Sequence, residues 1–380
     1  MNYFEQTRMT GRSKWYHWGF VFWITVLGWL LGQVFLTSPL PALASDIDPV
    51  LGQDFIQAST EMFESQNMAY IGLVSLGFLL TTLLGGIFAI IAYTTKSSSK
   101  RTLGIIAGFF IICSFVSLGL LSPLASSPES TDVINRLLAV SPTSYALVLL
   151  TFPATLVLLY VGQTQILKRT LTSLHTGFSK FSWSRTCQAF IIMWCVLGGL
   201  SLILHFTGTK PLNFTFDASK FFIYAAISLA LLPLQSATEE IVFRGYLNQA
   251  LESISRNKWI AFIITSLLFM SLHLANPEAL SGAEAGILPI VMSSYFFFGF
   301  AACLMVLIDD GLESAIGVHA ANNTFAAVFV NYGNSVLPTP SVFQIKTSPV
   351  LDSILTILTL SIILVMLYKT RHKHMRDVRG

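Results

Sequence analysis

The sequence predicts an all-α membrane protein, a polytopic bundle of about ten transmembrane helices. Hydrophobic residues make up 53% of the chain and charged residues 11%, with a mean hydropathy of +0.68. In soluble domains about a quarter of the residues are charged. Apolar stretches of about 20 residues, the length that a helix needs to cross the hydrocarbon core, recur along the chain. Basic residues collect between alternate stretches, as they do in cytoplasmic loops.

The spans can be placed one by one, because charged or turn-forming residues separate the apolar stretches. We place them at 15–37, 70–93, 102–123, 145–167, 187–206, 218–238, 259–275, 288–308, 313–331 and 352–368. The first span follows a basic segment and precedes Ala42-Leu43-Ala44, so it could also be a secretory signal with a cleavage site. Its length favours a retained span.

Loop charges predict the orientation. Lys and Arg lie in segments 8–14, 96–101, 168–185, 256–258 and 369–379, whereas Asp and Glu lie in 46–64, 129–132 and 278–284. We therefore expect an integral, multi-pass membrane protein with both termini in the cytoplasm. The turn with Asp309, Asp310 and Glu313 is an exception, because it falls on the inner side by count yet carries no positive charge. The net charge of +3 follows from this topology and indicates membrane lipid as a partner, with no nucleic acid.

The distribution of polar residues divides the chain into three regions. Residues 1–180 form an amino-terminal membrane region of about four spans, with few polar groups and no assigned function. Residues 181–335 carry the polar residues that need an explanation, and 336–380 form the last span and a basic tail. Ionisable side chains inside a membrane are costly and are usually functional. Chemistry is therefore expected in the second region.

The polar residues of that region fall on three predicted helices: Glu239, Glu240 and Arg244; His273; and His319 with Asn323. If the sixth span continues to Glu252 as one helix, Glu239 lies 13 residues before its end, and His273 lies 14 residues after Trp259 on the next helix. Both then stand about 20 Å from the same turn.

Spacing along each helix suggests a division of roles. Glu240 and Arg244 are four residues apart, the spacing of an intrahelical ion pair, which leaves Glu239 free to point elsewhere. His319 and Asn323 are also four apart and share one helix face. They form a second wall of the same predicted site.

Such a set of side chains can activate water. A buried Glu can act as general base with a nearby His relaying the proton, while an Asn amide and a second His can donate to the oxyanion of a tetrahedral intermediate. The carboxylate of Glu239 and the imidazoles of His273 and His319 would equally suit a catalytic zinc ion. The sequence does not choose between these mechanisms. It contains neither a His-Glu-x-x-His nor a Gly-x-Ser-x-Gly motif.

The motifs Glu239-Glu240-x-x-x-Arg244, Phe269-x-x-x-His273 and His319-x-x-x-Asn323 resemble those of the CAAX prenyl protease and bacteriocin-processing (CPBP, or Abi) family of intramembrane proteases. The resemblance covers roughly residues 180–335. It implies that Glu239 and His273 activate water and that His319 and Asn323 form the oxyanion side. Glu240 and Arg244 would brace the site. The resemblance leaves open whether such proteases use a metal or glutamate alone.

We therefore expect an intramembrane endopeptidase that acts on a membrane-associated peptide or protein, with or without a lipid anchor. A non-catalytic membrane scaffold or peptide-immunity protein is the first alternative. A proton-coupled transporter could also use Glu239 and His273, as a proton relay near the midplane. Internal repeat symmetry would support a transporter, and the sequence gives no sign of it.

Overall fold

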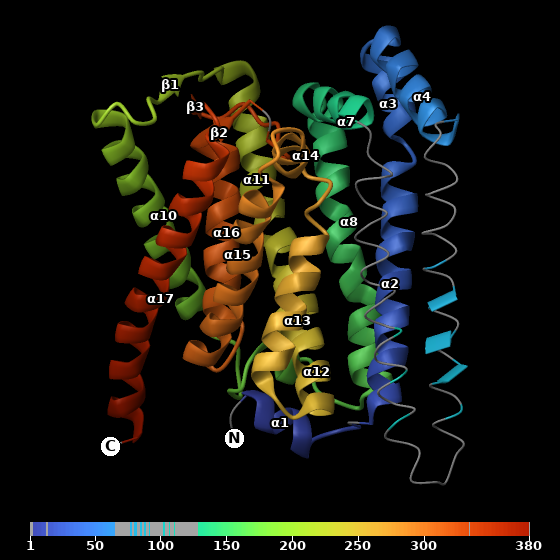
Figure 1. Cartoon of the computed structure of the whole chain (residues 1–380), viewed down its shortest axis with the longest axis vertical. Coiled ribbons are helices and arrows are strands. Elements are labelled where there is room, and N and C mark those ends of the chain that lie inside the picture. Colours follow the sequence, from blue (N-terminus) through green and yellow to red (C-terminus); the bar gives the residue numbers. More distant parts are fainter. Residues whose placement is uncertain are drawn as a thin grey trace.

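The structure, a computed structural model, describes residues 3–12, 14–64, 128–333 and 335–379, with isolated positions between 77 and 110. Its long helices run roughly along one axis and form a bundle with short elements at both ends (Figure 1). The all-α fold class predicted from composition is confirmed. The predicted spans at 70–93 and 102–123 fall mostly outside the described residues.

The described part of the chain folds into helices and three short strands. The first half of the chain contains α1 (Tyr3–Met9), α2 (Trp15–Thr37), α3 (Leu40–Ile47), α4 (Pro49–Glu64), α7 (Pro128–Val140), α8 (Pro142–Val161), the π-helical segment η1 (Gly162–Ile166) and α9 (Thr172–His175). The second half contains α10 (Trp183–Phe206), α11 (Ala218–Glu240), the π-helical segment η2 (Ile241–Leu247), α12 (Asn248–Ser255), α13 (Lys258–Ser271), α14 (Pro277–Glu284), α15 (Leu288–Asp309), α16 (Glu313–Val328) and α17 (Pro349–Arg379). Short strands β1 (Asn213–Phe214), β3 (Phe343–Ile345) and β2 (Val330–Tyr332) form one sheet in that spatial order, with β3 antiparallel to β1 and parallel to β2.

Six helical stretches in the described part of the chain are long and apolar enough to cross a membrane: Trp15–Ile47, Pro142–Ile166, Trp183–Phe206, Ala218–Ser255, Leu288–Asp309 and Pro349–Arg371. Each coincides with one predicted span. α13 and α16 also coincide with predicted spans, but their 14 and 16 residues fall short of the roughly 20 that a helix needs to cross hydrocarbon. The total of about ten spans stays a prediction.

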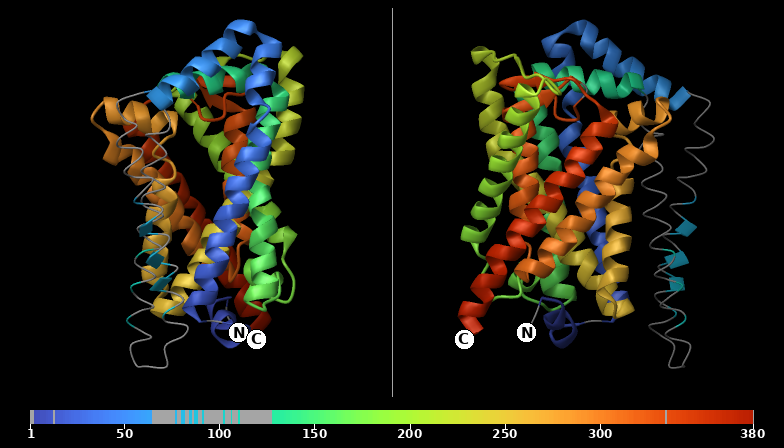
Figure 2. Two further views of the ribbon diagram at one scale, coloured as in Figure 1. Left: turned by 90° about the vertical axis from the view of Figure 1, so that its right-hand side faces the viewer. Right: turned by 60° about the vertical axis from the view of Figure 1, so that its left-hand side comes forward.

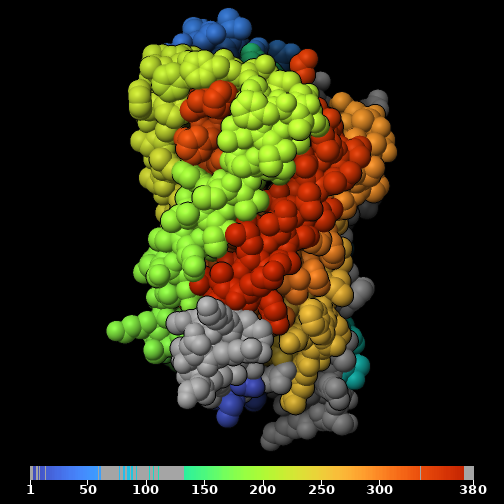
Figure 3. Space-filling model, turned by 90° about the vertical axis from the view of Figure 1, so that its left-hand side faces the viewer, coloured from blue at the N-terminus to red at the C-terminus, as the bar shows by residue number. Residues whose placement is uncertain are grey.

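The outer surface of the bundle suits a membrane. Figure 3 shows the face where α10 and α17 lie side by side. Large apolar side chains are exposed along both helices, among them Trp183, Ile191, Ile203, Phe206, Ile354, Leu358 and Val365. Soluble monomers rarely expose contiguous apolar surface of this kind. Lipid would cover it in a membrane-embedded bundle.

The two ends of the bundle differ in charge. Both termini lie at one end (Figures 1 and 2), together with the basic turn between α12 and α13. The opposite end carries α3, α4, α7 and α14, where the acidic segments 46–64, 129–132 and 278–284 lie. This grouping agrees with the alternation of loop charges. Which end faces the cytoplasm stays a prediction.

Arginines from segments distant in sequence bind the acidic turn between α15 and α16. Arg371 on α17 donates from Nε to the Asp309 carboxylate at 2.7 Å, and Arg185 donates from Nη1 to the Asp309 carbonyl at 3.1 Å. Arg371 also contacts Gln188 on α10 through Nη1 at 2.5 Å. The turn therefore ties α10, α15 and α17 together, which explains an acidic turn on the basic side.

The amino-terminal helices pack directly on the second half of the chain. α2 lies beside α8, and α8 in turn packs on α11 (Figure 2). Trp18 on α2 is buried, its ring lies 4.8 Å from the Arg169 guanidinium, and its carbonyl accepts a hydrogen bond from the Tyr246 hydroxyl on η2. Close packing and hydrogen bonds between helices stabilise membrane bundles, so these contacts fix α2 beside the helix that carries the glutamates.

Candidate active site

The two glutamates lie where one long helix changes its winding. Glu240 is the last residue of α11, and the π-helical segment η2 follows at once. Arg244 in η2 donates from Nη1 to Glu240 Oε1 at 3.1 Å, with both side chains fully buried. The predicted ion pair is thus present inside the bundle. It lies at a π-helical turn, a rare conformation that is often found at functional sites.

His319 on α16 connects both glutamates to a second helix. Its Nδ1 lies 2.7 Å from Glu240 Oε1, and its Nε2 lies 3.8 Å from Glu239 Oε2. A carboxylate only accepts hydrogen bonds, so Nδ1 is assigned as the donor, and Nε2 of a neutral imidazole then presents a lone pair. The Phe298 ring, 4.9 Å from the imidazole between centroids, fixes its position.

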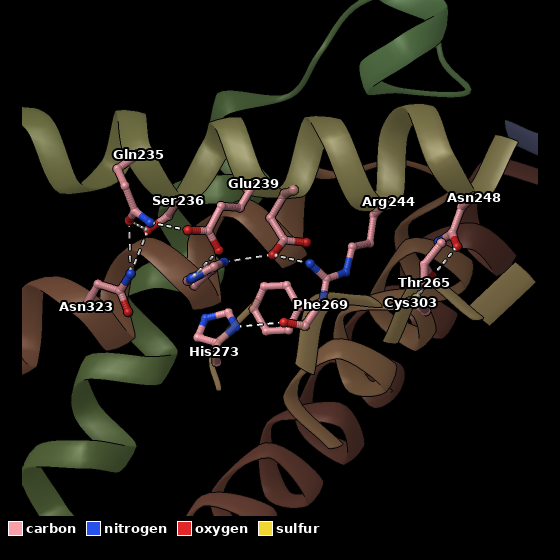
Figure 4. A network of polar contacts seen from close by, with 12 residues as sticks. Gln235, Ser236, Glu239, Arg244, Asn248, Thr265, Phe269, His273, Cys303 and Asn323 are labelled. Carbon is pink, nitrogen blue, oxygen red and sulfur yellow. Dashed lines mark hydrogen bonds and ion pairs between the residues drawn. The ribbon is translucent and has the colours of Figure 1, made fainter. Parts of the chain in front are cut away.

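Glu239 makes a different set of contacts from Glu240. Its Oε1 accepts a hydrogen bond from Gln235 Nε2, one turn earlier on α11 (Figure 4). Its Oε2 faces His319 Nε2, at a separation too long for a direct hydrogen bond. One carboxylate oxygen is therefore held from its own helix, and the other is turned toward the neighbouring imidazole.

Asn323 lies one turn beyond His319 on α16 and faces the same helix. Its Nδ2 donates to Gln235 Oε1 at 3.1 Å and to Ser236 Oγ at 3.2 Å, as Figure 4 shows. Its Oδ1 accepts from Asn322 Nδ2 at 3.2 Å. The shared face predicted for His319 and Asn323 thus meets α11, and Gln235 joins Asn323 to Glu239.

His273 reaches the site from the turn that follows α13. Its Nδ1 lies 2.7 Å from the Phe269 carbonyl, and its ring lies 4.4 Å from the Phe269 ring and 4.5 Å from the Tyr295 ring between centroids. Within the described chain no hydrogen bond joins His273 to Glu239. The two side chains instead line the same cavity, which agrees with the equal height predicted for them.

The cavity has a volume of about 660 Å³, which is within the range of small-molecule sites. Glu239, His273, His319, Asn322 and Asn323 line its polar wall. Apolar residues of α2 and α8 line another wall: Phe22, Val26, Trp29, Leu149 and Phe152. The lining then extends to α14 and β2, next to the end of the bundle away from both termini.

Comparison with known proteins finds similarity over part of the chain. Residues 218–325 match the family described as type II CAAX prenyl endopeptidase Rce1-like, and this range contains every motif residue from Glu239 to Asn323. This segment of the chain is therefore similar to the CPBP family. Over 196 residues it is also 34% identical to YyaK of Bacillus subtilis (strain 168), an uncharacterized protein, and the match covers 50% of this chain and 64% of YyaK. The matched part thus spans a little less than two thirds of that relative. No solved structure matches the chain.

The matched segment 218–325 supplies the polar wall of the cavity, whereas α2 and α8 lie outside it. The resemblance drawn from the three motifs is confirmed at the level of the family. Phe269, the aromatic position of the second motif, packs 4.4 Å from the Arg244 guanidinium and against the His273 ring. Its contacts support the buried arginine by a cation–π interaction.

The CPBP motif residues do not assemble as a ligand set for zinc. Among the described residues, no group of three or more His, Cys, Asp or Glu side chains is close enough to hold a metal ion. Glu239 and His319 approach each other at 3.8 Å, and His273 makes no hydrogen bond or ion pair with either carboxylate in the described chain. We therefore derive no step through a metal.

Several polar residues of the site were not predicted from the sequence. Gln235 and Ser236 bind Asn323, and Gln235 also binds Glu239. Their signal was available, because Gln235 lies four residues before Glu239 inside an apolar span. Asn322, next to Asn323 on α16, also lines the cavity.

Proposed function

We propose that this protein is an intramembrane endopeptidase that hydrolyses a peptide bond with water activated by Glu239. The observation that carries the proposal is the unequal use of two adjacent carboxylates. Glu240 is bound to Arg244 and His319, whereas Glu239 lines the cavity with Oε2 not hydrogen-bonded to any described side chain. The match of residues 218–325 to a family of endopeptidases supports the same conclusion at family level.

The proposed reaction proceeds through a tetrahedral intermediate. Glu239 takes a proton from water while the water oxygen attacks the carbonyl carbon of the scissile bond, and the carbonyl electrons move to its oxygen. Collapse of the intermediate re-forms the carbonyl, breaks the bond between carbon and nitrogen, and delivers the proton held by Glu239 to the leaving nitrogen. The products are a carboxylic acid and an amine.

The neighbouring residues have separate roles in this proposal. The 3.8 Å between Glu239 Oε2 and His319 Nε2 suits a water that both atoms contact, so we place His319 beside the water. The Asn323 amide is the donor for the oxyanion, and one of its two N–H groups turns to the substrate from Gln235 or Ser236, to which both donate in the free protein. His273, with Nδ1 engaged by the Phe269 carbonyl, presents Nε2 to the cavity and relays protons. This arrangement moves His319 from the oxyanion side, where the sequence predicted it, to the water.

We also infer that both termini face the cytoplasm, because the described basic segments 168–185 and 256–258 lie at the end where the termini lie. The cavity lining then extends toward the outer end. Labelling of single cysteines with a membrane-impermeant maleimide in intact cells tests this orientation. A cysteine at the exposed Ser255 should stay unlabelled, and a cysteine at the exposed Asp48 should react.

The proposed activity can be tested with purified protein in lipid vesicles. A panel of apolar peptides, with and without a farnesylated Cys-a-a-X end, is incubated with wild type and with Glu239→Gln, before and after chelation. Cleavage by wild type alone is expected. Equal cleavage by the variant would contradict the role of Glu239, and no cleavage of any peptide would favour a non-catalytic scaffold. Loss of cleavage on chelation would show that a metal is needed.

A further inference from the structure

A second acidic site lies in the cavity, at the end away from Glu239. Glu278, near the start of α14, accepts a hydrogen bond from the Tyr332 hydroxyl on β2 through Oε1. The Tyr295 hydroxyl on α15 lies near the same carboxylate and accepts from Asn276 Nδ2 at 3.0 Å. All four side chains line the cavity. Three separate elements thus bring polar groups around one carboxylate.

No ion pair joins the Glu278 carboxylate to a cation of the described chain. Its Oε2 is buried and without a hydrogen-bond partner in the described chain, and no Lys or Arg is among the described residues that line the cavity. Burial raises the pKa of Glu278, although the Tyr332 hydroxyl opposes this effect. A buried carboxylate that lacks a cation is costly, so a positively charged ligand would relieve this cost.

The position of Glu278 relative to the site suggests what the ligand is. The Tyr295 ring that borders Glu278 also stacks on the His273 ring, 4.5 Å away between centroids. A molecule that contacts both Glu239 and Glu278 would therefore pass His273. The remaining wall is apolar, formed by α2 and α8. The cavity therefore has the Glu239 carboxylate in one part, the Glu278 carboxylate in another, and an apolar wall formed by α2 and α8.

We propose that Glu278 binds a positively charged group of the substrate, which makes the substrate an apolar peptide with a lysine or arginine side chain, or a free amino terminus, beyond the scissile bond. This rests on the proposed peptidase function. The carboxylate accepts hydrogen bonds from the ammonium or guanidinium group while Tyr332 holds its other oxygen in place.

A binding experiment tests this without requiring turnover. In the Glu239→Gln background, the affinities of paired fluorescent peptides are measured in lipid vesicles. One peptide of each pair carries lysine and the other carries norleucine at the same position; norleucine has a similar apolar chain but no charge. Further pairs place this substitution at successive positions along the peptide. At one position the lysine peptide should bind about 10- to 100-fold more tightly, the range expected for a hydrogen bond to a charged group. Adding Glu278→Gln, which retains an acceptor for Tyr332, should bring the ratio close to one.

Three outcomes would be decisive. A lysine preference that Glu278→Gln removes supports the proposal. A preference that survives Glu278→Gln, or equal binding of both peptides at every position, overturns it. Cleavage of the same peptides by the protein with Glu239 intact is measured separately, so a failed peptidase proposal would appear as cation-selective binding without hydrolysis.

Discussion

His319 and Glu240 are 79 residues apart in sequence and are joined by a 2.7 Å hydrogen bond between α16 and α11. Together with the 3.1 Å contact from Arg244, this bond engages Oε1 of Glu240 from two sides. Glu240 is completely buried, so its charge is balanced by the protein itself. The carboxylate available for chemistry is therefore that of its neighbour, Glu239.

The buried ion pair predicts a large effect on stability. Arg244→Met removes the cation and leaves Glu240 buried and uncompensated, which should lower the free energy of unfolding by about 3–5 kcal/mol. Arg244→Met combined with Glu240→Gln removes both charges and should recover part of the loss. Thermal unfolding in detergent measures both variants. Equal melting temperatures for the single and double variants would contradict this account of the pair.

Gln235 is predicted to position Glu239 and Asn323 at the same time. Gln235→Leu keeps the size of the side chain but removes the hydrogen bonds to both residues, so kcat should fall about 10- to 100-fold with a small change in KM. Gln235→Glu restores an acceptor for Asn323 and adds a negative charge beside Glu239. That charge should shift the pH at which activity appears. An unchanged kcat for Gln235→Leu would exclude the positioning role.

Substitution of Gly317 is predicted to change the stability of the protein through helix packing alone. A Cβ at this position of α16 would lie 2.3 Å from the Thr186 carbonyl oxygen and 3.1 Å from Ala189 Cβ on α10. Gly317→Ala should therefore separate the two helices and destabilise the protein by about 1–3 kcal/mol. Gly199→Ala on α10 is a matched control, because a Cβ there would meet no described atom beyond its own helix backbone within 4 Å. Similar melting temperatures for both variants would contradict the close approach.

Glu278 gives a prediction about pH. Because burial raises its pKa, the folded protein binds this proton more tightly than the unfolded chain does. The corresponding stability is present at low pH and is lost as the pH rises through the raised pKa. Glu278→Gln stays neutral, so its melting temperature relative to wild type should increase from pH 4 to pH 8.

The surroundings of Glu278 keep this prediction simple. The groups that face it are the hydroxyls of Tyr332 and Tyr295 and the backbone amides of Glu278 and Val336, which do not titrate between pH 4 and 8 in ordinary proteins. Glu284→Gln, at an exposed position of the same helix, is the control and should show a constant difference. A constant difference for Glu278→Gln as well would contradict its burial as the cause.

The sequence predicted those features that charge and hydropathy mark strongly. An ionisable residue inside an apolar stretch is conspicuous, which is why Glu239, His273 and His319 were identified before their contacts were known. Gln235 and Ser236 are neutral and cost less to bury, so their presence in an apolar span does not by itself indicate a functional site. Glu278 falls in a predicted outer loop, where an acid needs no explanation.

The features that depend on packing could not be predicted in this way. A helix surrounded by lipid and apolar neighbours is apolar on all sides, so no amphipathic face shows that α2 and α8 line the cavity. Tyr332 lies 54 residues after Glu278, and only the fold of β2 brings them together. The sequence places the acidic turn at Asp309 on the inner side without a nearby basic residue, and only the fold brings Arg371 into contact with it.

The role of Glu239 as the base is tested most directly by the kcat of Glu239→Gln on one peptide that wild type cleaves, in the same vesicles and with melting temperatures measured for both proteins. General base catalysis typically contributes about 10²- to 10⁴-fold. We expect a loss of at least about 100-fold in kcat at an unchanged melting temperature. A folded variant that retains more than about a tenth of the wild-type kcat would show that another group activates the water.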